Sequence, residues 1–153
     1  MRKYQFLLFI VFILSAGCTS SSSEPSEKTN PIHISNVSTK HSYDQSYANQ
    51  AKSTLAQKKN VTKVFAVNSD KLLMIAIDVP HHERLQLKKY EKKLTKEMKK
   101  KFKKTSLKVE VSSDQKILWK LEQLEEEIRN GSISKKELKK KLEDISKLMK
   151  EKT

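Results

Sequence analysis

The chain has 153 residues, of which 36% are hydrophobic and 33% are charged, and its formal net charge is +14. This length allows one small domain with tails, and the low apolar content limits the size of its core. The single cysteine excludes an intramolecular disulfide and a multi-cysteine metal site, the two glycines exclude a glycine-rich phosphate-binding loop, and the positive charge favours a polyanionic partner.

The N-terminus has the order of an export signal. Arg2 and Lys3 precede nine consecutive apolar residues at positions 6–14, a run too short to span a bilayer but as long as the apolar core of a signal peptide. Ser15-Ala16-Gly17-Cys18 follows and resembles the lipobox of bacterial lipoproteins, whose cysteine is diacylglycerated. Ser15 stands where that motif usually has a branched apolar residue. We expect residues 1–17 to be a lipoprotein signal peptide; the alternatives are an ordinary secretory signal and an uncleaved anchor.

Residues 18–42 are expected to form the lipidated cysteine and a flexible tether. Positions 19–42 are rich in Ser, Thr, Asn and Pro, and they contain too few large apolar side chains to offset the entropy of ordering. Acyl chains on Cys18 would hold the protein on the extracytoplasmic face of the cell membrane. The tether would then have a root-mean-square reach of roughly 25–30 Å.

The first folded elements are predicted from position 43 onwards. Tyr47, Ala51 and Leu55 lie four residues apart, which predicts one face of a helix with Asp44 as its cap and Asn60 at its end. Short β-branched segments at 61–68 and 71–79, joined by a turn at 68–70, predict a hairpin. The second segment has apolar residues at both odd and even positions, so we expect it to be the central strand of a sheet.

The C-terminal half alternates between helices and one further strand. Residues 81–104 form an amphipathic pattern with Leu87, Tyr90, Leu94, Met98 and Phe102 on one face, and 107–111 alternates as a strand. A helix is expected from Asp114 to the break at Asn130-Gly131, and the capping box Ser134-x-x-Glu137 starts the last one. The order predicts an α+β protein, in which a small α-β-β-α-β sandwich (43–114) with a three-stranded sheet precedes a C-terminal helical hairpin (115–153) packed on it.

The lysine-rich segment 81–104 is the most suggestive feature of the mature chain. It contains eleven Lys or Arg residues against three Glu. One interpretation is a solvated helix face; another is contact with anionic lipid or wall polymer, and nucleic acid is disfavoured because no aromatic-basic stacking motif accompanies the lysines. The residues proposed for polyanion contact are Arg84, Lys88, Lys89, Lys92, Lys93, Lys96, Lys99, Lys100 and Lys103.

The other polar motifs predict neither a metal site nor a catalytic site. His81 and His82 are adjacent and have no further ligands at metal-binding spacing, so we expect no metal. The acidic run Glu122, Glu125, Glu126 and Glu127 follows the rhythm of an exposed helix face, and Trp119 is expected to pack at the edge of the hairpin. We therefore expect neither a cofactor nor an enzymatic activity, and the sequence identifies no protein partner.

The whole chain resembles the YhcN/YlaJ-type sporulation lipoproteins of Bacillus-like spore formers. The similarity lies in the lipobox, the small residues Ala48 and Ala51, and the motifs at 61–67, 75–79, 109–114 and 128–131. The hairpin turn here lacks the family's glycine, and the chain is unusually rich in lysine. The resemblance implies a role in sporulation or germination at the forespore or spore inner membrane, and it supplies no catalytic residues. The α-β-β-α-β part also resembles envelope modules of the BON type, which is an analogy of fold only.

Overall fold

The computed structural model describes residues 32, 34–36 and 43–151. Within them the elements follow the order α2 (Ser46–Ala56), β1 (Lys63–Asn68), β2 (Leu72–Asp78), the 3-10 helix η1 (His81–Gln86), α3 (Leu87–Lys101), β3 (Lys108–Ser112), α4 (Gln115–Arg129) and α5 (Lys135–Glu151). The predicted α-β-β-α-β-α-α order is confirmed. The signal peptide and Cys18 lie outside the described residues.

The strands form one mixed sheet in the order β1-β2-β3. β1 and β2 are antiparallel, with Phe65 opposite Ala76, and β2 and β3 are parallel, with Leu73 opposite Val109. The parallel pairing requires a crossover, which η1 and α3 provide. β2 is therefore the central strand, as its apolar residues on both faces predict.

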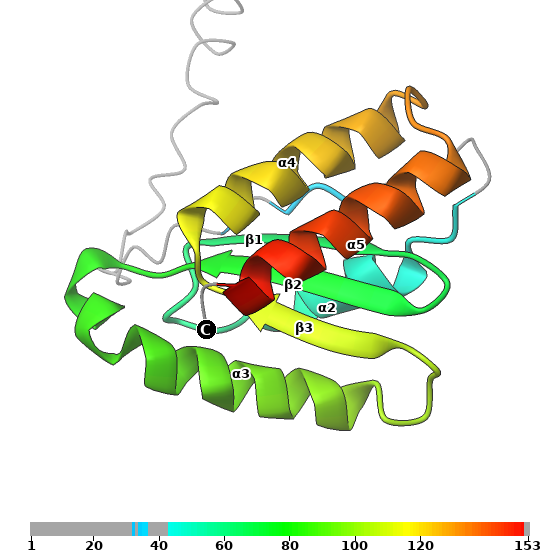
Figure 1. Cartoon of the computed structure of the whole chain (residues 1–153). Coiled ribbons are helices and arrows are strands. Elements are labelled where there is room, and N and C mark those ends of the chain that lie inside the picture. Colours follow the sequence, from blue (N-terminus) through cyan, green and yellow to red (C-terminus); the bar gives the residue numbers. More distant parts are fainter. Residues whose placement is uncertain (1–31, 33, 37–42, 152–153) are drawn as a thin grey trace, which may run out of the picture.

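Each face of the sheet has its own hydrophobic core, so the molecule has three layers (Figure 1). One core joins Leu73, Ile75 and Ile77 of β2 to residues of α2 and α3. The other joins Leu72, Met74 and Ala76 to residues of α4 and α5. The alternation of strand side chains thus places the first two helices on one side of the sheet and the C-terminal hairpin on the other.

The predicted boundaries of the C-terminal helices are confirmed by their caps. The Asp114 carboxylate accepts hydrogen bonds from the backbone N–H groups of Lys116 (2.8 Å) and Ile117 (3.3 Å). At the start of α5, the Ser134 N–H donates to Glu137 Oε2 (2.9 Å), and the Glu137 N–H donates to Ser134 Oγ (3.3 Å). Gly131 has φ of 67°, a left-handed conformation that glycine adopts without steric cost after α4.

The predicted helix over 81–104 is divided in the structure. Residues 81–86 form η1, in which no side chain is buried, and the α-helix begins only at Leu87. Because helical stability in proteins comes mainly from packing an apolar face, a segment without one has no support for a regular α-helix. The apolar stripe of α3 is buried at Leu94 and Met98, and Phe102 follows it into the core.

The face that α2 buries differs by one position from the predicted one. Ala51 and Leu55 are buried as expected, but Ala48 takes the third place and Tyr47 is 38% exposed. The Tyr47 ring instead contacts the edge of Phe102 at a centroid distance of 6.1 Å. The Asp44 carboxylate accepts a hydrogen bond from the Ser46 N–H (2.8 Å), although Gln45 occupies the capping position itself.

Part of the predicted tether packs against the domain. Ile32 and Ile34 are partly buried against the core of α2 and α3. The carbonyl of Ser35 accepts a hydrogen bond from Lys52 Nζ at 2.6 Å. Three residues that the sequence analysis assigns to the tether, Ile32, Ile34 and Ser35, therefore contact the folded elements.

Candidate functional site

The strongest candidate for an interaction site is the outward side of η1 and α3. All nine residues predicted for polyanion contact are exposed there, and we call them the basic surface: Arg84, Lys88, Lys89, Lys92, Lys93, Lys96, Lys99, Lys100 and Lys103. At about 100° per residue, the α3 lysines among them cover the side of the helix opposite its buried stripe. The seven lysines of α3 thus share one face of the helix, while Arg84 lies in η1 before it and Lys103 in the turn after it.

The carboxylates of η1 and α3 bond to neighbouring segments of the domain. Glu91 accepts a hydrogen bond from the Ser113 N–H (2.8 Å), and Glu97 pairs with Lys58 (2.6 Å). Glu83 accepts a hydrogen bond from Asn60 Nδ2 (3.0 Å). These three carboxylates are therefore engaged by residues outside the basic surface.

The basic surface is almost free of ion pairs within the part of the chain that the structure describes. Arg84 lies 3.6 Å from Asp78, and the eight lysines form no ion pair there. On the other side of the sheet, three lysines around the C-terminal hairpin do pair, with Asp70, Glu127 and Asp144. Positive charge is therefore uncompensated on α3 and partly compensated on α5, which makes α3 the element best suited to meet a polyanion.

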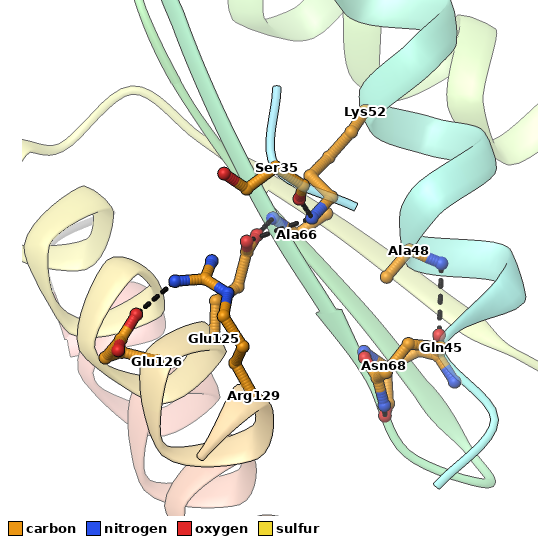
Figure 2. Close-up of polar contacts among 9 residues, drawn as sticks. All are labelled: Ser35, Gln45, Ala48, Lys52, Ala66, Asn68, Glu125, Glu126 and Arg129. Carbon is orange, nitrogen blue, oxygen red and sulfur yellow. Dashed lines mark hydrogen bonds and ion pairs between the residues drawn. The ribbon is translucent and has the colours of Figure 1, made fainter. Parts of the chain in front are cut away.

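A buried ion pair at the edge of β1 is the second polar feature, and sequence analysis missed it. Lys52 of α2 and Glu125 of α4 come from opposite layers of the molecule and meet at 2.9 Å, with side chains 1% and 2% exposed (Figure 2). Glu125 also accepts a hydrogen bond from the Ala66 N–H (2.8 Å). The prediction that Glu125 is exposed is wrong. The sequence does carry one indication of this burial: Glu125 lies four residues after Leu121 and three before Ile128, which places it on the apolar side of α4.

The pair covers part of the outer edge of β1, one of the two edge strands of the sheet. Gln45 covers the edge further along β1. Its Nε2 donates a hydrogen bond to the Asn68 carbonyl (2.7 Å), and its Oε1 accepts one from the Asn68 N–H (3.0 Å). The Asn68 side chain in turn accepts a hydrogen bond from the Ala48 N–H (3.0 Å; Figure 2). Exposed strand edges invite pairing with other chains, and these side chains block that edge.

The electrostatics of Glu125 fit a structural role. Burial raises the pKa of Glu125 above its usual value, while the charge of Lys52 and the Ala66 N–H act in the opposite direction. Both charged groups are thus engaged with each other and with backbone atoms: Lys52 with Ser35, and Glu125 with Ala66. This arrangement holds α2, β1, α4 and residue 35 together.

Trp119 is not packed at the edge of the hairpin as predicted. Its side chain is 55% exposed and lies in a groove of about 890 Å³ between the edge of β1 and α4. Gln123, Arg129 and Lys63 line the same groove, and Ile32 and Ser35 contribute to its wall. Residues from the segment ahead of α2 thus reach this side of the domain.

The described residues contain neither a metal-ligand cluster nor a membrane-spanning helix. His81 and His82 are exposed at the start of η1, and no cluster of three potential metal ligands exists in this part of the chain. No described helix is long and apolar enough to cross a bilayer.

Comparison with known proteins identifies the family. A search of curated proteins and a search of solved structures each gave no match, so the BON-type analogy stays a prediction. The family model described as sporulation lipoprotein YhcN/YlaJ matches residues 20–146, which include the strands β1, β2 and β3 and the helices α2, α3 and α4. The chain therefore belongs to the YhcN/YlaJ family of sporulation lipoproteins.

Proposed function

We propose that the protein is a non-enzymatic lipoprotein, anchored through acyl chains on Cys18 to the extracytoplasmic face of the cell membrane. The observation that carries this proposal is the order at the N-terminus. A basic start, an apolar run at 6–14 and Ser15-Ala16-Gly17-Cys18 precede a domain that belongs to a lipoprotein family. Two acyl chains anchor a protein stably, whereas a single chain holds only marginally.

The cellular role that we propose is in sporulation or germination, at the forespore or spore inner membrane. Family membership supports a role in sporulation. The buried charges support a binding or structural role over catalysis. Lys52 and Glu125 pair with each other and with backbone groups, so neither is directed at a substrate. Timed fluorescence microscopy of a tagged copy in sporulating cells tests the location: a signal at the forespore membrane is expected, and a diffuse cytoplasmic signal would contradict it.

Metabolic labelling with a radioactive fatty acid tests the anchor. The wild-type chain should incorporate label, Cys18→Ala should lose it, and Ser21→Ala serves as the matched control because it changes the same segment without removing the thiol. Equal labelling of wild type and Cys18→Ala would overturn the anchor. An unlabelled wild type in cells whose other lipoproteins are labelled would do the same.

A second candidate function, binding of a polyanion through segment 84–104, is favoured by one specific observation. Eight exposed lysines of the basic surface have no ion pair among the described residues. Anionic lipid, wall polymer and nucleic acid all present phosphate or similar groups that such lysines bind, with an affinity that falls steeply as salt rises. Binding to none of these polyanions at low salt would exclude this function.

A further inference from the structure

We propose that the basic surface docks the domain onto an anionic lipid bilayer, and that Leu85 enters the acyl region at the end of this contact. The inference rests on the proposed function, because an anchored chain keeps the domain at the bilayer. It goes further by selecting lipid among the polyanions and by assigning a role to an apolar residue outside both cores.

Leu85 is the first observation. It is 98% exposed, compared with 55% for Trp119 and 38% for Tyr47, the other exposed large hydrophobic residues of the described chain. Single exposed leucines are common on protein surfaces, so its position is what matters. Leu85 follows Arg84 directly and lies one turn before Lys88 and Lys89. An apolar side chain thus stands at the end of a strongly basic surface.

The charge distribution is the second observation. Glu91 and Glu97 bond to Ser113 and Lys58, which leaves the outward side of α3 purely basic. Each lysine near an anionic membrane strengthens binding on the order of fivefold. Several lysines on one helix face contact a flat surface together, and their contributions then multiply.

The third observation is the length of chain between the anchor and the domain. Ile32 and Ile34 pack on the same core as α3, so only residues 19–31 separate Cys18 from the packed domain. These 13 residues span at most about 45 Å even when fully extended. A domain held this close has a high effective concentration at the membrane, so a weak surface contact is sufficient to dock it.

Leu85 is also the reason to favour lipid over the other polyanions as the ligand of this surface. A wall polymer or a nucleic acid offers phosphate to lysines but no acyl region to a leucine. Single-stranded nucleic acid is usually also held by exposed aromatic rings that stack on its bases, whereas Phe102 is 3% exposed and Tyr90 packs against the core of α2 and α3. The surface therefore combines the two features that an anionic bilayer recognises: cationic groups and an insertable apolar side chain.

A tryptophan probe at position 85 tests insertion. The full chain carrying Leu85→Trp and Trp119→Phe has a single tryptophan, and it is reconstituted into vesicles of phosphatidylcholine alone or of phosphatidylcholine with phosphatidylglycerol. In the anionic vesicles we expect a blue shift of the emission and quenching by lipids brominated on their acyl chains. The chain with its native Trp119 and Leu85 is the control and should show neither. An unchanged probe in anionic vesicles, or an equal shift in both kinds of vesicle, would overturn the proposal.

Lysine substitution tests the electrostatic part. The variant Lys88→Gln, Lys92→Gln, Lys96→Gln should weaken docking on the order of hundredfold, from about fivefold per lysine. The matched control Lys136→Gln, Lys139→Gln, Lys140→Gln removes the same charge from α5, on the opposite side of the sheet, and should leave docking nearly unchanged. Equal losses in both variants would show that only net charge matters, and would overturn the assignment to this surface.

Protection of lysines from a water-soluble acylating reagent, read by mass spectrometry, tests Leu85 itself. Anionic vesicles should protect the α3 lysines but not those of α5, and Leu85→Ser should weaken this protection about tenfold. Stronger protection by soluble wall polymer or DNA than by vesicles would overturn the choice of lipid. Repeating the measurement with Cys18→Ala, which carries no acyl chains, separates failure of docking from failure of the anchor. Protection of the α3 lysines by anionic vesicles at raised vesicle concentration is expected in this variant too, and its absence there would overturn docking independently of the anchor.

Discussion

At the scale of single residues, Lys52 and Glu125 impose the strongest electrostatic constraint in the described part of the chain. They are 73 positions apart and belong to helices on opposite faces of the sheet, yet they meet beside Ala66 at its edge. A buried charge without a partner is far more costly than an apolar side chain in the same place. The two residues therefore stabilise the fold only as a pair.

Removing one charge of this pair should destabilise the domain strongly. Lys52→Met leaves Glu125 buried and unpaired, and we expect a loss of about 3–5 kcal/mol in the free energy of unfolding, measured with urea. Lys52→Met combined with Glu125→Leu should recover most of that loss, since the remaining cost is the unpaired Ala66 N–H and Ser35 carbonyl. Lys58→Met is the control, because the Lys58–Glu97 pair is about one-third exposed and should contribute less than about 1 kcal/mol. A double variant less stable than Lys52→Met alone would contradict this account.

At the scale of elements, the sequence predicts a helix or strand correctly where the residues that define it lie within that helix or strand. The capping box of α5, the Asp114 cap of α4 and the apolar residues on both faces of β2 are all local signals, and the structure confirms the predictions made from them. The split of the helix predicted over 81–104 could not be foreseen, because it depends on which part of the segment the rest of the protein covers. For Glu125 a local signal existed, since its spacing from Leu121 and Ile128 places it on the apolar side of α4. Its partners, Lys52 and the Ala66 N–H of β1, are far away in the sequence and could not be predicted from it.

The capping box of α5 should make stability depend on pH in the acid range. Hydrogen bonds from Ser134 lower the pKa of Glu137 below its ordinary value of 4.5. A carboxyl with a lower pKa in the folded state adds stability that is fully present above the unfolded pKa and is lost as pH falls through the folded pKa. Glu137→Gln keeps the length of the side chain but not its charge, so its stability should lack this pH-dependent contribution.

Thermal unfolding of both proteins over a series of pH values checks this prediction. The wild type should unfold at a higher temperature than Glu137→Gln near neutral pH, and this difference should disappear as the pH falls below about 4.5. Glu143→Gln is the control, since Glu143 is an exposed glutamate of the same helix that forms no hydrogen bond among the described residues. A difference between wild type and Glu137→Gln that is constant across pH would contradict the role of the charge.

At the scale of the whole molecule, the segment ahead of α2 connects the predicted anchor to the domain. Its composition predicts a tether, and composition cannot show that Ile32 and Ile34 pack against the core or that Lys52 binds the Ser35 carbonyl. The contacts of Ile32, Ile34 and Ser35 therefore limit how far the domain can lie from Cys18. The anchor itself and the domain boundaries stay predictions from the sequence.

Packing of this segment predicts that truncation on either side of it gives different stabilities. A chain that begins at residue 32 should be more stable than one that begins at residue 37 by about 2 kcal/mol, since the shorter chain loses the partial burial of Ile32 and Ile34 and the acceptor for Lys52. Urea unfolding of the two chains measures the difference. Ile32→Ser with Ile34→Ser in the longer chain should reproduce the apolar part of the loss while keeping the Ser35 carbonyl. Equal midpoints for both truncations would mean that the segment does not hold to the domain in solution, and the distance between anchor and domain would then be set by the full length of residues 19–42.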